Sequence, residues 1–136
     1  MPKHRFILAA VVCGVALAGS PAARAQTTPA PGGQQDMLRM MHLAARNQLG
    51  VLEFCQGQGS VGQDVVDQQR KLMALLPAAQ VDGLDEAEAN GKRGIVVFAG
   101  SQTSLADAAQ AQNTTVEAMC KQMGALIQAQ AAQMPK

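Results

Sequence analysis

The sequence predicts a small, mainly α-helical bundle that is closed by one disulfide and follows a cleaved leader. Apolar residues recur at three- and four-residue steps over most of residues 36–134, which is the spacing of amphipathic helices. Strong β-formers gather in only one run, residues 95–98. Two cysteines remain after the leader, so only one intramolecular disulfide can form.

The first 25 residues have the layout of an export signal. Lys3 and Arg5 are basic, residues 6–17 are almost all apolar, and Ala23-Arg24-Ala25 has the small-x-small pattern of a signal-peptidase site. The apolar run is shorter than the roughly twenty residues that span a bilayer, so an anchor is less favoured. We expect cleavage between Ala25 and Gln26 and a periplasmic or secreted protein of 111 residues.

Charge and cysteine usage limit the partners and the redox chemistry. Cleavage leaves eight basic and ten acidic side chains, a net charge of −2, which predicts neither nucleic-acid binding nor charge-driven adhesion to an anionic membrane. Cys13 leaves with the signal, whereas Cys55 and Cys120 remain for an oxidising compartment. We expect them to form a structural disulfide; two buried free thiols are the alternative, and a catalytic pair would have closer spacing.

The first helix is expected over residues 36–56, after a flexible lead-in over residues 26–35 that has no apolar period. Asp36 is the N-cap candidate, and Gly57 and Gly59 follow the end. The core-facing stripe consists of Leu38, Met41, Ala45, Leu49 and Leu52, and is widened by Met37, Met40, Ala44, Val51 and Cys55.

Two further helices are expected over residues 62–76 and 84–90. Pro77 closes the former and Gly91 the latter. The β-formers of residues 95–98 stand between glycines, and they predict either a short strand or a buried extended segment.

A helix pair is expected over residues 104–112 and 114–133. Ser104 with Asp107, and Thr114 with Glu117, resemble capping boxes, and Asn113 suits the left-handed conformation between two helices. Cys120 falls on one stripe with Val116, Met123 and Ile127. A Cys55–Cys120 bond would then tie the end of the first helix to the last.

No catalytic residue, metal ligand or cofactor site is predicted. His42 is the only histidine after the leader, and no serine or free thiol at local spacing makes it a general base. Cys-x-x-Cys, histidine pairs and calcium-binding loops are absent from the sequence. The acidic run of Asp82, Asp85, Glu86 and Glu88 is typical of a solvated helix start.

Seven methionines are many for so short a mature chain: Met37, Met40, Met41, Met73, Met119, Met123 and Met134. Thioethers are soft copper ligands, but Met37, Met40 and Met41 do not alternate with the histidines or carboxylates that would strengthen a copper site. Helical methionines more often fill a core or form an adaptable binding surface, and the second role suits a protein that binds several partners.

Three resemblances add expectations of their own. Residues 96–119, VVFAGSQTSLADAAQAQNTTVEAM, resemble the first two-thirds of a LysM module, which runs strand, helix, helix, strand and implies peptidoglycan binding. Residues 37–123 are similar to small exported proteins catalogued as pore-forming ESAT-6-like. The similarity lies in the segments LEFC, GKRGIVVFAG and SLADAAQAQNTTVEAMCKQM. The small helical chain with one disulfide also resembles acid-stress chaperones of the HdeA type.

We therefore expect a non-enzymatic exported protein that interacts with proteins or the cell envelope through an Ala/Met-rich helical surface. The alternatives are a membrane-active, pore-forming ESAT-6-like protein, an acid-stress periplasmic chaperone, and a peptidoglycan-associated LysM-like module. An enzyme is the least supported class.

Overall fold

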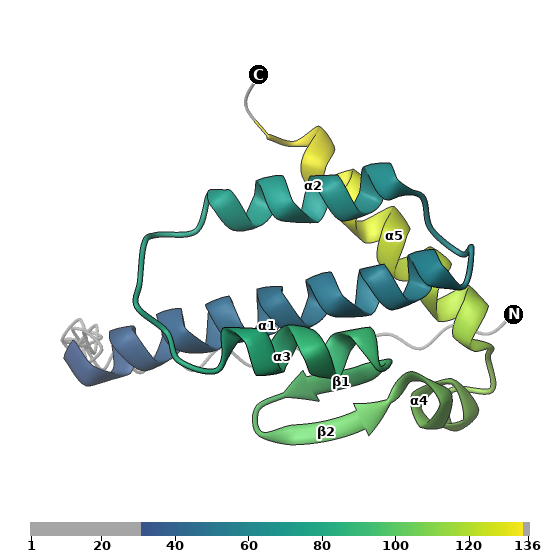
Figure 1. The fold of residues 1–136 in the computed structure, drawn as a ribbon, viewed down its shortest axis with the longest axis horizontal. Helices are drawn as coiled ribbons and strands as arrows, with labels where there is room; N and C mark the ends of the chain where they lie inside the picture. Colours follow the sequence, from purple (N-terminus) through teal and green to yellow (C-terminus); the bar gives the residue numbers. More distant parts are fainter. Residues whose placement is uncertain (1–30, 135–136) are drawn as a thin grey trace, which may run out of the picture.

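The computed structural model describes residues 31–134, which form a helical bundle with one small β-hairpin (Figure 1). The predicted signal, its Ala25–Gln26 cleavage site and residues 26–30 lie outside the described residues. In chain order the elements are α1 (Pro31–Gly57), α2 (Gln63–Ala74), α3 (Leu84–Lys92), β1 (Ile95–Phe98), β2 (Ser101–Ser104), α4 (Leu105–Ala111) and α5 (Val116–Ala132). The mainly α-helical fold is confirmed.

Helix α1 is the central element, with α2 along one side and α3 along the other (Figure 1). It begins at Pro31, so Asp36 lies within the helix and the predicted N-cap at Asp36 is wrong. Proline is favoured in a first helical turn because its missing N–H would be unpaired there anyway. Helix α2 returns antiparallel to α1, and Pro77 follows it as expected.

Two glycines set the close approach of α1 and α3. Gly50 of α1 faces the backbone of Glu88 and Lys92, and Gly91 of α3 faces the backbone of Asn47 on α1. A Cβ at either position would collide with main-chain atoms. Gly91 therefore lies inside α3 as a packing residue, and the prediction that it ends the helix is wrong. The chain turns two residues beyond the helix at Gly94, where φ is +72°.

The run of β-formers is a strand, paired with a second strand. Antiparallel β1 and β2 are joined through Ala99 and Gly100, both with positive φ, as a tight two-residue hairpin turn requires. The partner strand has the sequence Ser-Gln-Thr-Ser, which is polar and mostly exposed. Sequence pattern did not predict β2 because only one of its four residues is a β-former.

Asn47, in the middle of α1, holds the hairpin against the helix bundle. Its side-chain nitrogen donates to Ala87 O at 3.0 Å and to Ile95 O at 2.9 Å. Its side-chain oxygen accepts from Val97 N at 2.9 Å. The groups of Ile95 and Val97 lie on the edge of β1 away from β2, so one buried amide satisfies a strand edge that no other strand covers.

Replacing Asn47 by alanine should detach the hairpin from α1. The change leaves three backbone groups without their partner, so we expect a loss of about 2–3 kcal/mol in the free energy of unfolding. Urea unfolding measures that loss, and hydrogen exchange should show lower protection of the Val97 amide. Gln102→Ala, on exposed β2, is the matched control. Unchanged exchange at Val97 in Asn47→Ala would contradict this role.

The last two helices start at side-chain caps. Ser104 Oγ accepts from Asp107 N at 3.0 Å, which confirms the predicted cap of α4. Helix α5 is capped by Thr115, whose Oγ1 accepts from Ala118 N at 3.1 Å, and not by Thr114 as expected. Asn113 has φ of +51°, the left-handed conformation predicted for it.

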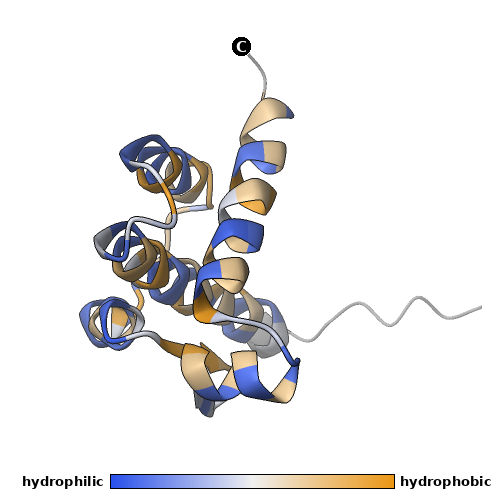
Figure 2. Ribbon diagram, turned by 90° about the vertical axis from the view of Figure 1, so that its right-hand side faces the viewer, coloured by the Kyte–Doolittle hydropathy of each residue, from blue (hydrophilic) through white to orange (hydrophobic). Residues whose placement is uncertain are grey.

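The core consists of two clusters that meet α1 on neighbouring faces. The first joins α1, α2 and α5 through Leu49, Leu52, Val65, Val66 and Ile127. The second surrounds the Cys55–Cys120 disulfide, with Val51 and Leu105, and confirms the predicted pairing. Both cysteines are 0% exposed and their Cα atoms are 5.5 Å apart. Viewed almost along α1, the hydrophobic ribbon segments of the helices face inward (Figure 2).

Alternating charges link the three neighbouring helices on the side opposite the disulfide cluster. The chain of contacts runs through Asp67, Arg70, Glu53, Lys92, Glu88 and Arg46. Lys92 Nζ contacts Glu88 at 2.7 Å and Glu53 at 3.1 Å, so it joins α3 to α1. Pairs of this exposure are individually weak, and the network acts mainly to fix the helix register.

Alkaline pH should weaken this network at Lys92. Hydrogen bonds to Glu88 and then to Glu53 raise the pKa of Lys92 above its ordinary 10.5. A raised pKa in the folded state contributes stability below the unfolded-state pKa, and that contribution is lost as pH rises through the folded pKa.

We therefore expect the urea midpoint to fall above pH 10.5 in the native protein and to fall less in Lys92→Met. No tyrosine and no free thiol of the described residues titrates in this range, so the alkaline loss comes from the lysines, and the comparison with Lys92→Met isolates the share of Lys92. Lys71→Met, at an exposed position, is the control. An equal alkaline loss in Lys92→Met would refute the assignment.

Candidate interaction surface

No catalytic arrangement forms around the histidine of the described region. His42 Nε2 lies 2.8 Å from Pro77 O, so its ring joins α1 to the loop after α2. Over residues 31–134, no group of three or more His, Cys, Asp or Glu side chains could hold a metal ion. No helix in the same range is long and apolar enough to cross a membrane.

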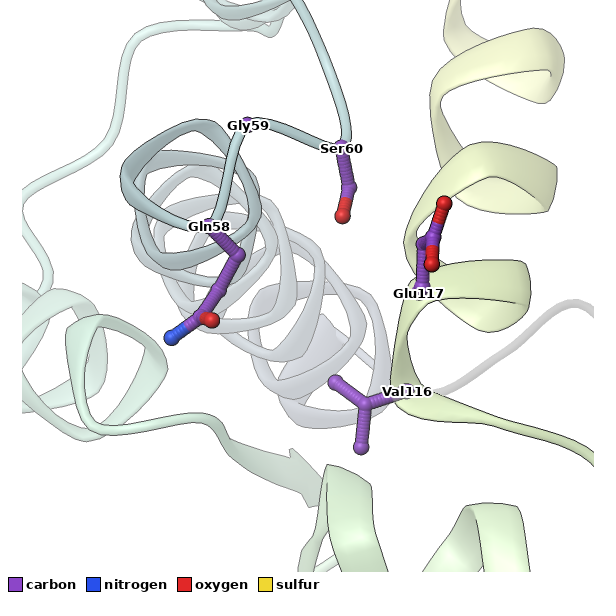
Figure 3. A pocket seen from close by; sticks show the side chains of 5 residues that line it. All are labelled: Gln58, Gly59, Ser60, Val116 and Glu117. Atoms are coloured by element: carbon purple, nitrogen blue, oxygen red, sulfur yellow. The ribbon is translucent and has the colours of Figure 1, made fainter.

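Two small, open hollows lie on the surface of the described domain. One has a volume of about 310 Å³ and lies between the end of α1 and the start of α5, lined by Gln58, Gly59, Ser60, Val116 and Glu117 (Figure 3). Another, of about 230 Å³, lies beside Asp85, Glu88, Ala89 and Lys92. Neither contains a nucleophile with a partnered base. The carboxylates there have local roles: Glu117 pairs with Lys121, and Glu88 with Lys92.

Six of the seven described methionines fall into two groups, and Met134, half-buried just beyond α5, belongs to neither. Met73, Met119 and Met123 pack against the core clusters. Met37, Met40 and Met41 are exposed by 58%, 57% and 45% of their surface. Met41 was expected on the core-facing stripe, widened by Met37, Met40 and Ala44, and that prediction is wrong for these four residues, whereas Leu38 and Ala45 of the stripe are half-buried.

We call Met37, Met40, Met41 and Ala44 the methionine face. Their spacing of three and four residues places them on one side of α1, and all four are exposed. The same side continues through Val51 and Cys55, which are buried in the disulfide cluster. The methionine face is therefore the uncovered continuation of a core-facing stripe.

The path of α5 explains why this stripe is half covered. Helix α5 meets α1 at Cys120, and Ile127 then packs against residues of both α1 and α2. Farther along, Gln128 approaches Asp64 of α2. Helix α5 thus crosses α1 near the C-terminal end of α1 and continues over α2, so it leaves the N-terminal half of α1 uncovered, and the first turns of α1 extend beyond the other elements (Figure 1).

The hairpin adds an aromatic side chain on the side of the domain that carries the methionine face. Phe98, at the tip, is 77% exposed. It shares a side of β1 with Val96, which packs against the disulfide cluster, because alternate residues of a strand point the same way. Strand β1 starts near Phe54 and passes Asn47, so its tip extends toward the N-terminal half of α1 (Figure 1).

The rim of the methionine face carries little charge. Gln34 on one flank and Gln48 beyond Ala44 are uncharged, and Asp36 on the other flank is the one ionised residue among these; Arg39 lies on the opposite side of α1. An apolar patch with such a rim favours burial against another apolar surface over attraction by charge.

Sequence reasoning found the methionines but missed other residues that build this surface. Phe98 was assigned only to a strand or buried segment, yet its side chain is the most exposed of the large hydrophobic residues in the described region. Asn47 and Gly50, which hold β1 and α3 on α1, gave no signal because their partners are distant in sequence. The spacing of Met37, Met40 and Met41 was visible, but their exposure depends on the path of α5, which crosses from α1 to α2.

The architecture defines a disulfide-linked helical domain with a β-hairpin and an uncovered apolar helix face. Comparisons with family models, curated proteins and solved structures found no match. Residues 96–119 form most of β1, then β2, α4 and the start of α5, so both strands precede the helices. The ESAT-6-like, LysM-like and HdeA-type resemblances remain predictions.

Proposed function

We propose that this protein is a non-enzymatic, exported interaction factor that binds a protein partner in the periplasm through the methionine face and Phe98. The observation that carries the proposal is the exposure of three methionines that continue a buried stripe of α1. A soluble domain rarely leaves a row of large apolar side chains in water unless the row contacts another molecule.

The partner chemistry that fits is an amphipathic helix with an apolar stripe. Long thioether side chains adapt to differently shaped apolar surfaces, and the exposed length of α1 offers a helix-packing surface. Phe98 would supply an aromatic anchor at one edge. The low charge of the rim supports a partner recognised by apolar contact, so affinity should change little with salt.

Photo-crosslinking in living cells tests this function. A photoreactive amino acid is placed at Met40 and at Phe98, with exposed Ala89 of α3 and Gln130 of α5 as control positions. We expect the first two positions to give the same discrete protein adduct and the controls to give none. Adducts of equal yield at all four positions, or no adduct at Met40 and Phe98, would reject the docking surface.

The predicted export requires its own measurement. N-terminal sequencing of the protein from the periplasm or medium should begin at Gln26, and only uncleaved chain in the cytoplasm would refute the localisation. Membrane and cell-wall activity are separated with the purified mature protein. Dye release from vesicles would favour the pore-forming alternative. Co-sedimentation with cell-wall sacculi would favour the LysM-like alternative, and suppression of client aggregation in acid would favour the chaperone alternative.

A further inference from the structure

We propose that the methionine face is an oxidant-responsive modification site, whose conversion to methionine sulfoxide abolishes docking. The oxidant belongs to the class of peroxides or hypohalous acids. The site of modification follows from the exposure of the side chains, whereas its effect on docking rests on the proposed function.

The three methionines of the face are more accessible than the packed ones. Met37, Met40 and Met41 expose roughly half of their surface, while Met73, Met119 and Met123 pack against the two core clusters. Oxidation of a thioether requires the oxidant to reach the sulfur, so exposure controls susceptibility. The fold therefore divides six methionines of identical chemistry into an exposed group on α1 and a partly buried group, which we expect to react more slowly.

Few other side chains compete for the oxidant. Cys55 and Cys120 are already oxidised to a disulfide and are 0% exposed. The chain contains no tryptophan or tyrosine. Within the described residues, exposed thioethers are therefore the most readily oxidised groups, and the three exposed methionines all lie on α1.

The chemical step is a two-electron oxygen transfer. With hydrogen peroxide, the sulfur lone pair attacks one oxygen, an S–O bond forms and the O–O bond breaks. The proton of the transferred oxygen passes to the departing hydroxide, which leaves as water. The thioether is oxidised to a sulfoxide, peroxide is reduced, and methionine sulfoxide reductases can reverse the change.

Modification at these positions should alter the surface and leave the fold intact. Neither core cluster includes Met37, Met40 or Met41. A sulfoxide replaces an apolar group by a strongly polar one, so three of them on one helical face would make that face hydrophilic. A partner that buries this face would have to desolvate the new S–O groups without hydrogen bonds.

Peptide mapping after graded peroxide treatment tests the site. Trypsin cuts after Arg39 and Arg46, so Met40 and Met41 share one peptide, and Met37 lies in the peptide before it. We expect these peptides to gain three oxygen atoms in total before the peptides of Met73 and Met119 gain any. Met123 shares its peptide with Met134, so fragment ions must show that Met123 itself stays unoxidised at that stage. The circular dichroism spectrum should stay unchanged at that stage. Equal oxidation of all six methionines, or early loss of helix, would overturn the assignment.

The effect on docking is measured by crosslinking from Phe98, which peroxide does not oxidise. Oxidation should remove the Phe98 adduct in the native protein. The variant Met37→Leu/Met40→Leu/Met41→Leu keeps the apolar face without sulfur, so its adduct should survive; Met134→Leu is the control that stays sensitive.

The outcomes separate the two proposals. No adduct before oxidation rejects the proposed function and leaves the peptide map to judge the modification site. An adduct that persists after full oxidation of the methionine face rejects the switch alone. Equal oxidant sensitivity in the triple leucine variant would also reject the switch, because its face has no sulfur.

Discussion

Alanine at Gly50 should be among the most damaging single-methyl additions in this fold. The new Cβ would meet the carbonyl oxygen of Glu88 and would lie 2.9 Å from Lys92 N, so it presses on main chain that cannot rotate away. Helices α1 and α3 must separate, which strains the Asn47 bonds as well. We expect unfolding to become easier by about 1–3 kcal/mol, the usual cost of overpacking, measured as a lower urea midpoint.

Gly57→Ala is the matched control for this prediction. Gly57 is also in α1, but a Cβ there meets nothing within 4 Å. Alanine is the better helix former by up to about 1 kcal/mol, so Gly57→Ala should be neutral or stabilising. The two substitutions are thus expected to have opposite signs. A Gly50→Ala protein as stable as the native one would show that α1 and α3 do not pack at this distance.

Loss of the Cys55–Cys120 bond should destabilise the fold even more. The bond joins residues 65 positions apart, and the chain-entropy model assigns about 4 kcal/mol to closing a loop of this length. Both sulfurs also lie inside the second core cluster with Val51 and Leu105, so cleavage would weaken the packing of α4 and α5.

Thermal unfolding by circular dichroism with and without reductant measures this effect. We expect a large decrease in melting temperature after reduction, and a similar low value for the double variant Cys55→Ala/Cys120→Ala. The double variant should not respond to reductant, which controls for unrelated effects of the reagent. A melting temperature unchanged by complete reduction would be incompatible with the disulfide as a main source of stability.

Local signals in the sequence predicted the local structure well. Ser104 caps α4, Asn113 adopts positive φ, and Pro77 follows α2, because each depends on neighbours within a few residues. The pairing of Cys55 with Cys120 could also be predicted, since no other described cysteine competes. The N-cap of α5 was predicted one residue too early, because the adjacent Thr114 and Thr115 both carry a hydroxyl that can cap a helix.

Features that depend on tertiary contacts could not be predicted. Gly91 reads as a helix terminator in isolation, and only the proximity of Asn47 explains why α3 continues through it. Strand β2 forms because β1 is held on α1 and the turn at Ala99 and Gly100 brings its polar residues alongside. The methionine face has the period of a core stripe, and it is exposed because α5 crosses to α2 before reaching it.

The position of the disulfide has a mechanical consequence for a partner that holds α1. Cys55 and Cys120 close a covalent ring of chain that contains α2, α3, the hairpin and α4, whereas the methionine face lies outside that ring. Tension applied at Met40 and resisted at the C-terminal end of α5 passes along α1, across the sulfur atoms and directly into α5. The intervening residues carry none of that tension, so the ring cannot be extended by pulling while the disulfide holds.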